Sequence, residues 1–156
     1  MTAAKIRSAS LDDLSALLQL EDSFPEVDRF DVRTWRRLLA GKALTLVHET
    51  PRGIDAAAVL LFRARSSTAR LYSISVATSA RGQGIGGRLL AACEEHARQR
   101  GCARIRLEVR STNSSAHRLY EASGYRVIAA LESYYPDGEA AHRMEKVLIA
   151  SSDGAP

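Results

Sequence analysis

The chain has 156 residues, of which 46% are apolar and 26% are charged. A chain of this length buries roughly 70% of the surface that it exposes when unfolded, so it can form a core without disulfides or a structural metal. The longest apolar run, residues 56–62, is far shorter than the roughly 20 residues of a membrane span. We therefore expect a soluble, cytoplasmic protein with residues 1–150 in one domain and residues 151–156 as a flexible tail.

The net charge of +4, from 22 Lys and Arg against 18 Asp and Glu, is modest. It does not favour a nucleic-acid partner, and no membrane partner is expected. Residues 63–110 nevertheless contain ten Arg and three acidic residues, a basic segment that predicts contact with a small polyanionic cofactor. Cys93 and Cys102 have no partners at metal-ligand spacing, so plain thiols in a reducing compartment are expected and no metal site.

The first half of the chain predicts a strand, two helices and three further strands. A short strand around Ile6 precedes Ser10, which can cap a helix with Asp13 at the capping-box distance. Asp31 begins a second helix, which Gly41 ends. The β-rich runs that follow predict strands over residues 43–48, 54–64 and 70–76.

The second half alternates helices and strands. A glycine-rich segment, residues 82–87, leads into a helix that Gly101 ends as a left-handed cap. Apolar and charged residues alternate strictly over residues 103–110, as in a strand with one buried face. The remaining elements are a helix over residues 114–123 and strands over residues 125–131 and 142–149. This order predicts a single mixed α/β domain.

The segment 81–87 reads Arg-Gly-Gln-Gly-Ile-Gly-Gly and suits a phosphate group. Glycines let backbone amides approach an anion, the following helix contributes unpaired N–H groups and a positive dipole end, and Arg81 and Arg88 add charge. The alternative is a glycine-rich turn that only starts a helix. A dinucleotide fold is excluded because residues 77–81 separate the strand from the first glycine, and a P-loop because Arg88 stands where Lys is required.

Arg81, Gly84 and Gly86 resemble the acetyl-CoA pyrophosphate loop of the GNAT N-acetyltransferases, whose pattern is Arg/Gln-x-x-Gly-x-Gly/Ala. The resemblance continues through residues 107–113, Leu-Glu-Val-Arg-Ser-Thr-Asn, and residues 134–138, Tyr-Tyr-Pro-Asp-Gly. Over residues 71–146 the chain resembles the RimI-like branch, which acetylates protein N-termini. The resemblance implies a mixed, mostly antiparallel sheet of about six to seven strands flanked by about four helices.

The resemblance also implies roles for individual residues. Glu108 would be the general base and Tyr120 the acid that returns a proton to the leaving thiolate. Acetyl-CoA would be bound by Ile74, Ser75, Val76, Arg81, Gly82, Gln83, Gly84, Ile85, Gly86, Gly87, Asn113 and Tyr120. The acceptor amine would be bound by Phe24, Glu26, Tyr134 and Tyr135. The chain departs from the family pattern at two places. Residues 77–79 stand where the family often has Pro, and Thr112 stands where it usually has Ser. These departures affect the expected identity of the acceptor rather than the expected cofactor site.

Each of these residues also has a structural interpretation. Glu108 could form ion pairs with Arg106 and Arg110, Tyr120 could be a core aromatic, and Asn113 could cap the helix that follows it. The acidic loop at residues 21–31 could attract a basic acceptor, or could be an exposed polar loop with helix caps.

The leading hypothesis is a monomeric or homodimeric acetyl-CoA-dependent transferase that acetylates the N-terminal α-amine of a protein. Such an amine has a pKa of about 7.7–8.0 and must lose a proton before it can attack a thioester. The alternatives are acetylation of a small amine by the same machinery, and a CoA-binding regulatory module without turnover.

Overall fold

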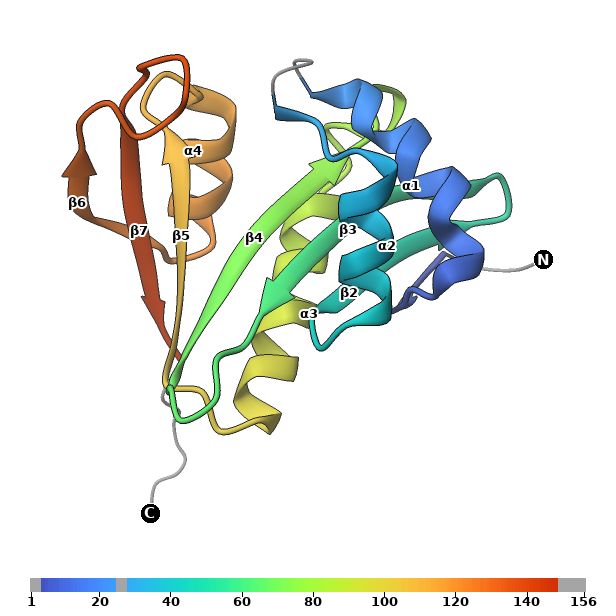
Figure 1. Cartoon of the computed structure of the whole chain (residues 1–156), viewed down its shortest axis with the longest axis horizontal. Coiled ribbons are helices and arrows are strands. Elements are labelled where there is room, and N and C mark those ends of the chain that lie inside the picture. The colour runs from blue at the N-terminus through green and yellow to red at the C-terminus, as the bar shows by residue number, and fades with distance from the viewer. Residues whose placement is uncertain (1–3, 25–27, 149–156) are drawn as a thin grey trace.

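The computed structural model describes residues 4–24 and 28–148. In this part of the chain one seven-stranded sheet has the order β1-β2-β3-β4-β5-β7-β6 (Figure 1). Its strands are β1 (Lys5–Ser8), β2 (Leu44–Thr50), β3 (Gly53–Leu61), β4 (Thr68–Val76), β5 (Arg104–Arg110), β6 (Arg126–Leu131) and β7 (Ala141–Val147). Only β4 and β5 are parallel, so the expected mixed and mostly antiparallel sheet is confirmed.

Helices cover the two faces of this sheet unequally. The α-helices are α1 (Leu14–Leu20), α2 (Val32–Ala40), α3 (Ile85–Gln99) and α4 (Ser114–Ala122), and short 3-10 turns lie at Leu11–Asp13, Glu21–Ser23 and Thr78–Ala80. Helices α1 and α2 pack on β2 and β3, where Trp35 and Leu17 are almost fully buried against Val47 and Val59. No helix in residues 4–24 and 28–148 is long and apolar enough to cross a membrane.

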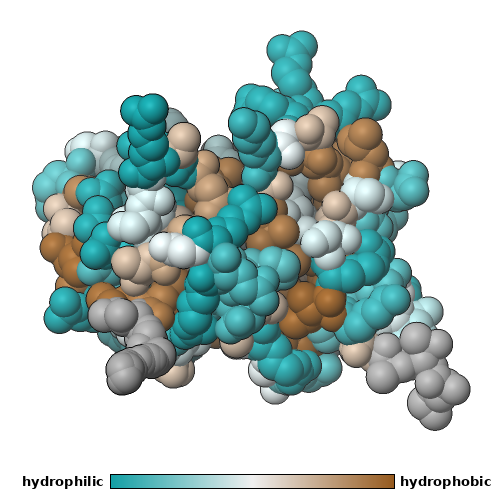
Figure 2. All heavy atoms as spheres, turned by 90° about the horizontal axis from the view of Figure 1, so that it is seen from below, coloured by the Kyte–Doolittle hydropathy of each residue, from teal (hydrophilic) through white to brown (hydrophobic). Residues whose placement is uncertain are grey.

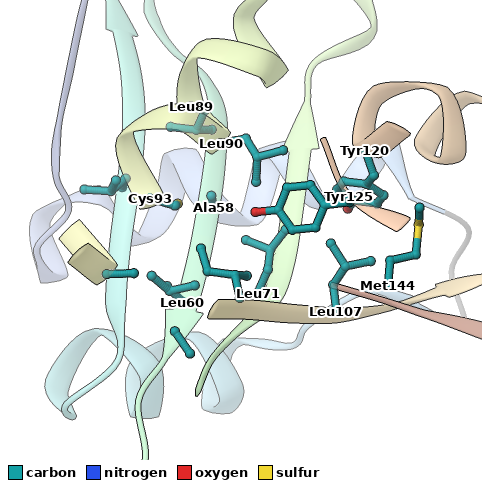
Figure 3. Close-up of a cluster of buried hydrophobic side chains, with 14 of the residues drawn as sticks. Ala58, Leu60, Leu71, Leu89, Leu90, Cys93, Leu107, Tyr120, Tyr125 and Met144 are labelled. Atoms are coloured by element: carbon teal, nitrogen blue, oxygen red, sulfur yellow. The ribbon is translucent and has the colours of Figure 1, made fainter. Parts of the chain in front are cut away.

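The opposite face of the sheet carries the larger core, to which α3 and α4 contribute. Leu89, Leu90 and Cys93 of α3 belong to the same buried cluster as Leu60 and Leu71 of the sheet (Figure 3). This cluster explains the alternation of β5, since all three of its apolar side chains point into the core and are buried. Burial raises the pKa of the Cys93 thiol to about 12, consistent with an unreactive core residue.

The predicted helix caps are present. Ser10 and Asp13 form the capping box, but the first helix is divided into a 3-10 turn and α1. Asp31 caps α2 by accepting a hydrogen bond from the Thr34 amide at 2.8 Å. Asn113 caps α4 by accepting from the Ala116 amide at 3.1 Å. These short-range signals are sufficient because a capping side chain and the backbone amide that donates to it lie within one helical turn.

Strand ends differ from the prediction at the turn between β3 and β4. We predicted a strand to residue 64, whereas β3 ends at Leu61 and β4 already begins at Thr68. The Ser66 amide donates to the Arg63 carbonyl at 3.1 Å, and Arg65 has a φ of 65°. The chain therefore turns at residues 63–66, although the composition of residues 54–64 predicted one continuous strand. The last strand likewise ends at Val147 rather than residue 149.

The parallel pair β4 and β5 determines where a ligand can enter. The two strands pair only over three positions, from Thr68 with Arg104 to Arg70 with Arg106. Beyond these positions β4 continues along β3 to Val76, whereas β5 continues along β7 to Arg110. The strands therefore diverge, and backbone groups on their facing edges have no strand partner there in the described residues (Figure 1).

Candidate active site

A cavity of about 900 Å³ lies between the diverging halves of β4 and β5. Its walls come from both strands, the glycine-rich turn, the start of α3, helix α4 and the segments around Phe24 and Tyr135. Parts of the chain that are far apart in sequence therefore meet in one cavity.

The glycine-rich turn is built by left-handed backbone at two positions. Gly82 has a φ of 81°, and Gly84, the N-cap of α3, has a φ of 78°, a region that side chains disfavour. The Arg81 Nε donates to the Val76 carbonyl at 3.2 Å, and Arg88 donates to the Gln83 carbonyl at 3.2 Å. Two guanidinium groups thus hold the turn at the end of β4.

The turn leaves space for a ligand beside its amides. Apart from its chain neighbours and the backbone of α3, a Cβ atom built on Gly87 or Gly82 would have no protein atom within 4 Å, and both glycines line the cavity. Gly86 differs, because its Cβ would lie 3.3 Å from Leu119 and its small size serves packing against α4. The positive end of α3 and these open amides fit the diphosphate of a nucleotide-containing cofactor.

The charge distribution led us to expect the arginines of residues 63–110 at this turn, but most of them lie elsewhere. Arg81 and Arg88 lie there, but Arg98 and Arg100 lie at the other end of α3, about 20 Å away along its axis. Arg104 pairs with Thr68 at the first residue of β4, whereas the glycine turn follows the last residue of that strand. Most of the basic charge of this segment therefore lies away from the glycine turn.

Tyr120 projects from α4 into the cavity wall. Its side chain is buried, and burial raises the pKa of its hydroxyl well above the ordinary value. In residues 4–24 and 28–148 this hydroxyl forms no hydrogen bond, whereas the neighbouring Tyr125 donates to Glu94 at 3.1 Å. Tyr120 is therefore both a core aromatic and a neutral phenol beside the cavity.

Glu108 lines the cavity from β5, with its side chain 8% exposed. One carboxylate oxygen accepts from Arg143 at 2.8 Å and the other lies 2.8 Å from an Nη of Arg70. The pairing that we considered from sequence, with Arg106 and Arg110, is wrong, because cross-strand neighbours lie closer than residues two apart on one strand. Glu108 thus forms ion pairs with two arginines from other strands.

Arg110, which sequence reasoning did not select, joins the two loops at the mouth of the cavity. Its guanidinium donates to both oxygens of Asp28, at 2.7 and 3.1 Å, and to Glu139 at 2.8 Å and Asp137 at 3.0 Å. The guanidinium carbon also lies 4.1 Å from the centre of the Tyr135 ring. Three carboxylates around one cation leave this mouth with a net negative charge.

An aromatic group forms the wall below this mouth. Phe30 stacks on Tyr72 with ring centres 5.3 Å apart, and both line the cavity together with Phe24 and Tyr135. Sequence analysis missed Phe30 and Tyr72 because nothing local distinguishes them from core aromatics. The alternation of β4 was the available signal, since Tyr72 is exposed between the buried Leu71 and the partly buried Ser73.

The acidic loop at residues 21–31 is exposed at Asp22 and Asp31 but not at Glu21. Glu21 is buried, and its carboxylate accepts from the Phe30 amide at 2.8 Å and the Trp35 indole at 2.9 Å. Burial raises the pKa of Glu21, although both hydrogen bonds oppose that shift. Asp31 serves as a helix cap, and among the described acids of this loop Asp28 lines the cavity.

Most of the predicted site residues lie around this one cavity. All of the predicted cofactor residues line it except Gln83, whose carbonyl accepts from Arg88. Phe24 and Tyr135 line it as expected for acceptor residues, whereas Tyr134 lies outside the lining and contacts Arg70 through its hydroxyl at 3.2 Å. Glu26 lies outside the described residues.

Comparison with protein families identifies the chain. The model of the Acetyltransferase (GNAT) family matches residues 13–125, which include the glycine turn, Glu108 and Tyr120. The chain belongs to the GNAT acetyltransferase family.

Curated relatives match the GNAT chain over part of its length. The [Ribosomal protein bS18]-alanine N-acetyltransferase of Escherichia coli strain K12 is 34% identical over 82 residues, which are 53% of this chain and 54% of that protein. Mycothiol acetyltransferase of Beutenbergia cavernae is 33% identical over 91 residues, 58% of this chain and 31% of that protein. The match spans about half the length of the first of these relatives.

Solved structures match the GNAT fold along nearly the whole chain. The crystal structure of the ribosomal-protein-S18-alanine N-acetyltransferase from Escherichia coli has a TM-score of 0.84 and 26% identity, and the match covers 98% of this chain and 99% of that one. Ard1 from Thermoplasma volcanium also has a TM-score of 0.84, with 23% identity over 96% of this chain and 100% of that one, and is similar in fold.

Proposed function

We propose that this protein is an acetyl-CoA-dependent N-acetyltransferase whose acceptor is the N-terminal α-amine of a protein. The observation that carries the proposal is the meeting, in one cavity, of an open glycine turn, the neutral phenol of Tyr120 and the carboxylate of Glu108. The relatives named as alanine N-acetyltransferases of a ribosomal protein support an α-amine acceptor.

In this proposal the backbone of β4 and α3 binds the cofactor. The exposed edge of β4 at residues 74–76 pairs with the pantetheine arm, and amides of residues 82–87 hold the diphosphate. Asn113 caps α4 with its Oδ1. Its contact with the cofactor is therefore made through its Nδ2 group. Acetyl-CoA supplies the thioester carbonyl that the amine attacks.

Glu108 and Tyr120 move the protons. A carboxylate has about four acceptor positions, and two are used by Arg70 and Arg143, so Glu108 can still accept a hydrogen bond from a water that takes the proton of the ammonium. Tyr120 stays protonated at neutral pH and can donate to the departing sulfur. Cys93 is buried, so this route needs no covalent enzyme intermediate.

The negative mouth around Arg110 supports a positively charged acceptor. Asp28, Asp137 and Glu139 exceed the single charge of Arg110, so the mouth attracts an ammonium group before deprotonation. The aromatic wall that contains Phe30 and Tyr72 can pack against the side chain of the first residue of the acceptor.

The test is thiol release from acetyl-CoA with a panel of peptides and free amines, followed by mass spectrometry of the peptides. We expect thiol release only with acceptor present and a single acetyl group on the peptide α-amine. Turnover on free amines with no acetylation of any peptide would favour the second candidate, a small-molecule acetyltransferase, which the match to mycothiol acetyltransferase supports. Tight CoA binding without thiol release on any acceptor would favour a regulatory module.

A further inference from the structure

One half of the sheet has a face that no helix of the described residues covers, and Glu108 lies at the edge of this face that borders the acetyl-transfer site. Helices α1 and α2 lie over β2 and β3, and in the described residues no helix lies on that side of β5, β7 and β6 (Figure 1). Apart from Arg110, whose charge is matched by the carboxylates of the cavity mouth, the register places five arginines and two glutamates on this face, for a net charge of +3: Arg70, Arg104, Arg106, Arg126 and Arg143, with Glu108 and Glu145. We call these five arginines the arginine face.

The glutamates lie beneath the arginines rather than among them. Glu145 is 10% exposed, and its carboxylate accepts from the Arg106 Nε at 2.7 Å and lies 3.7 Å from the Arg104 Nε. Glu108 is 8% exposed beneath Arg70 and Arg143 in the same way. The side chains of the four ion-paired arginines are 34–46% exposed. Arg126 is also exposed. Solvent therefore meets guanidinium groups, with the compensating charge buried below.

This arrangement orients the guanidinium groups for an external anion. Arg106 and Arg143 pair with their glutamates through Nε, and their terminal Nη atoms make no hydrogen bond within the described residues. A guanidinium held at Nε presents both Nη atoms outward, and this edge binds the two oxygens of a phosphate. Because these residues stand on a sheet, their backbone positions are spaced about 4.8 Å apart between strands and about 6.8 Å apart along one strand.

We propose that the arginine face binds the phosphate backbone of single-stranded RNA. A nucleic-acid strand carries one charge per nucleotide and can meet several of these regularly spaced groups at once. The net charge of +4 concealed this feature, because the buried glutamates and the acidic mouth of the cavity cancel much of it. Seen from below, the surface of the molecule is largely hydrophilic, with hydrophobic patches between the polar side chains (Figure 2).

The choice of RNA rests on the proposed function, since the named relatives act on a ribosomal protein. Arg70 links the two sites, because it pairs with Glu108 in the cavity wall and contacts Tyr134 in the loop that closes the mouth. An RNA strand on this face would hold an RNA-associated acceptor protein beside the cavity.

The test measures binding of a fluorescein-labelled single-stranded RNA of about 20 nucleotides by fluorescence anisotropy between about 50 and 200 mM KCl. We expect micromolar binding and, for the double variant Arg106→Gln/Arg126→Gln, a Kd at least about tenfold higher with a salt slope smaller by about 1.4. The matched control is Arg36→Gln/Arg37→Gln, which removes the same charge from the exposed face of α2 and should leave the Kd close to that of the unaltered protein.

Three further readouts make the outcome decisive. Tm and thiol release with a free peptide report folding and basal activity, so loss of RNA binding is separated from failure of the proposed function. If the glutamine variant unfolds, Arg106→Lys/Arg126→Lys keeps the charge and should weaken binding while retaining the salt slope. Absence of binding at about 50 mM KCl, equal weakening in the α2 control, or equal displacement by poly-glutamate or by anionic vesicles would overturn the proposal.

Discussion

Substitution of Gly87 by Ala separates a ligand-binding glycine from a structural one. Gly87 lies in the first turn of α3 without a left-handed φ, and a Cβ there would meet no protein atom within 4 Å. Replacing Gly by Ala in a helix stabilises it by about 0.5–1 kcal/mol. For a chain of this length that corresponds to a Tm increase of about 1–4 °C.

The same methyl group would extend into the space that we assign to the diphosphate of acetyl-CoA. Displacing the diphosphate from one amide removes a hydrogen bond to a charged group, which contributes about 1.5–3 kcal/mol. We therefore expect the KM for acetyl-CoA to rise by about 10- to 100-fold, while the KM for the acceptor stays the same. Stability is measured by thermal unfolding, and both KM values by thiol release at saturating co-substrate.

Gly86→Ala is the matched control, because it makes the same change one residue earlier. Its Cβ would lie 3.3 Å from the Leu119 side chain, so the added methyl group would meet protein rather than open space. We expect crowding to offset the helix stabilisation and the KM for acetyl-CoA to stay unchanged. A Gly87→Ala protein that is more stable and binds acetyl-CoA normally would refute the location of the diphosphate.

Further expectations concern proton transfer, the mouth of the cavity and alkaline stability. Tyr120→Phe should lower kcat by about 10²–10⁴-fold with little change in Tm, and normal turnover would remove the phenol from the mechanism. Glu108→Gln should lower kcat/KM more at pH 7 than at pH 9, where an α-amine has already lost its proton; an equal loss at both would indicate a structural role. Arg110→Gln should raise the KM for a peptide acceptor but not for acetyl-CoA, because it releases Asp28 from the other loop; unchanged constants would contradict this. Burial raises the pKa of Tyr120 and of Tyr125, so the folded state keeps protons that the unfolded state loses above about pH 10. The urea midpoint should therefore fall as pH rises through 10, and a flat profile to pH 11 would contradict it.

Local patterns predicted the elements around the glycine turn well. The turn, the cap at Asn113 and the alternation of β5 each depend on residues within a few positions of one another, so the sequence carries the whole signal. The partners of Glu108 could not be predicted in this way. Arg70 and Arg143 come from strands whose pairing with β5 is decided by the sheet order, and Arg106, which is nearer in sequence, turns to Glu145 instead.

Charge illustrates the same division. From sequence, the ten arginines of residues 63–110 formed one basic segment beside the glycine turn, and the acids of residues 21–31 formed one exposed rim. Folding separates both groups, because a strand or helix carries neighbouring residues of the chain to opposite ends of the molecule. Glu21 is buried against Trp35, and Arg110 faces three carboxylates.

The sequence by itself determined the single α/β domain, the glycine-rich turn before α3 and the family that the chain resembles. These properties depend on composition, hydrophobic period and short motifs, which are written along the chain. Only the tertiary structure decided which carboxylate meets which guanidinium, and that an arginine face stands apart from the cofactor site. Those contacts depend on the order and register of strands that lie far apart in sequence.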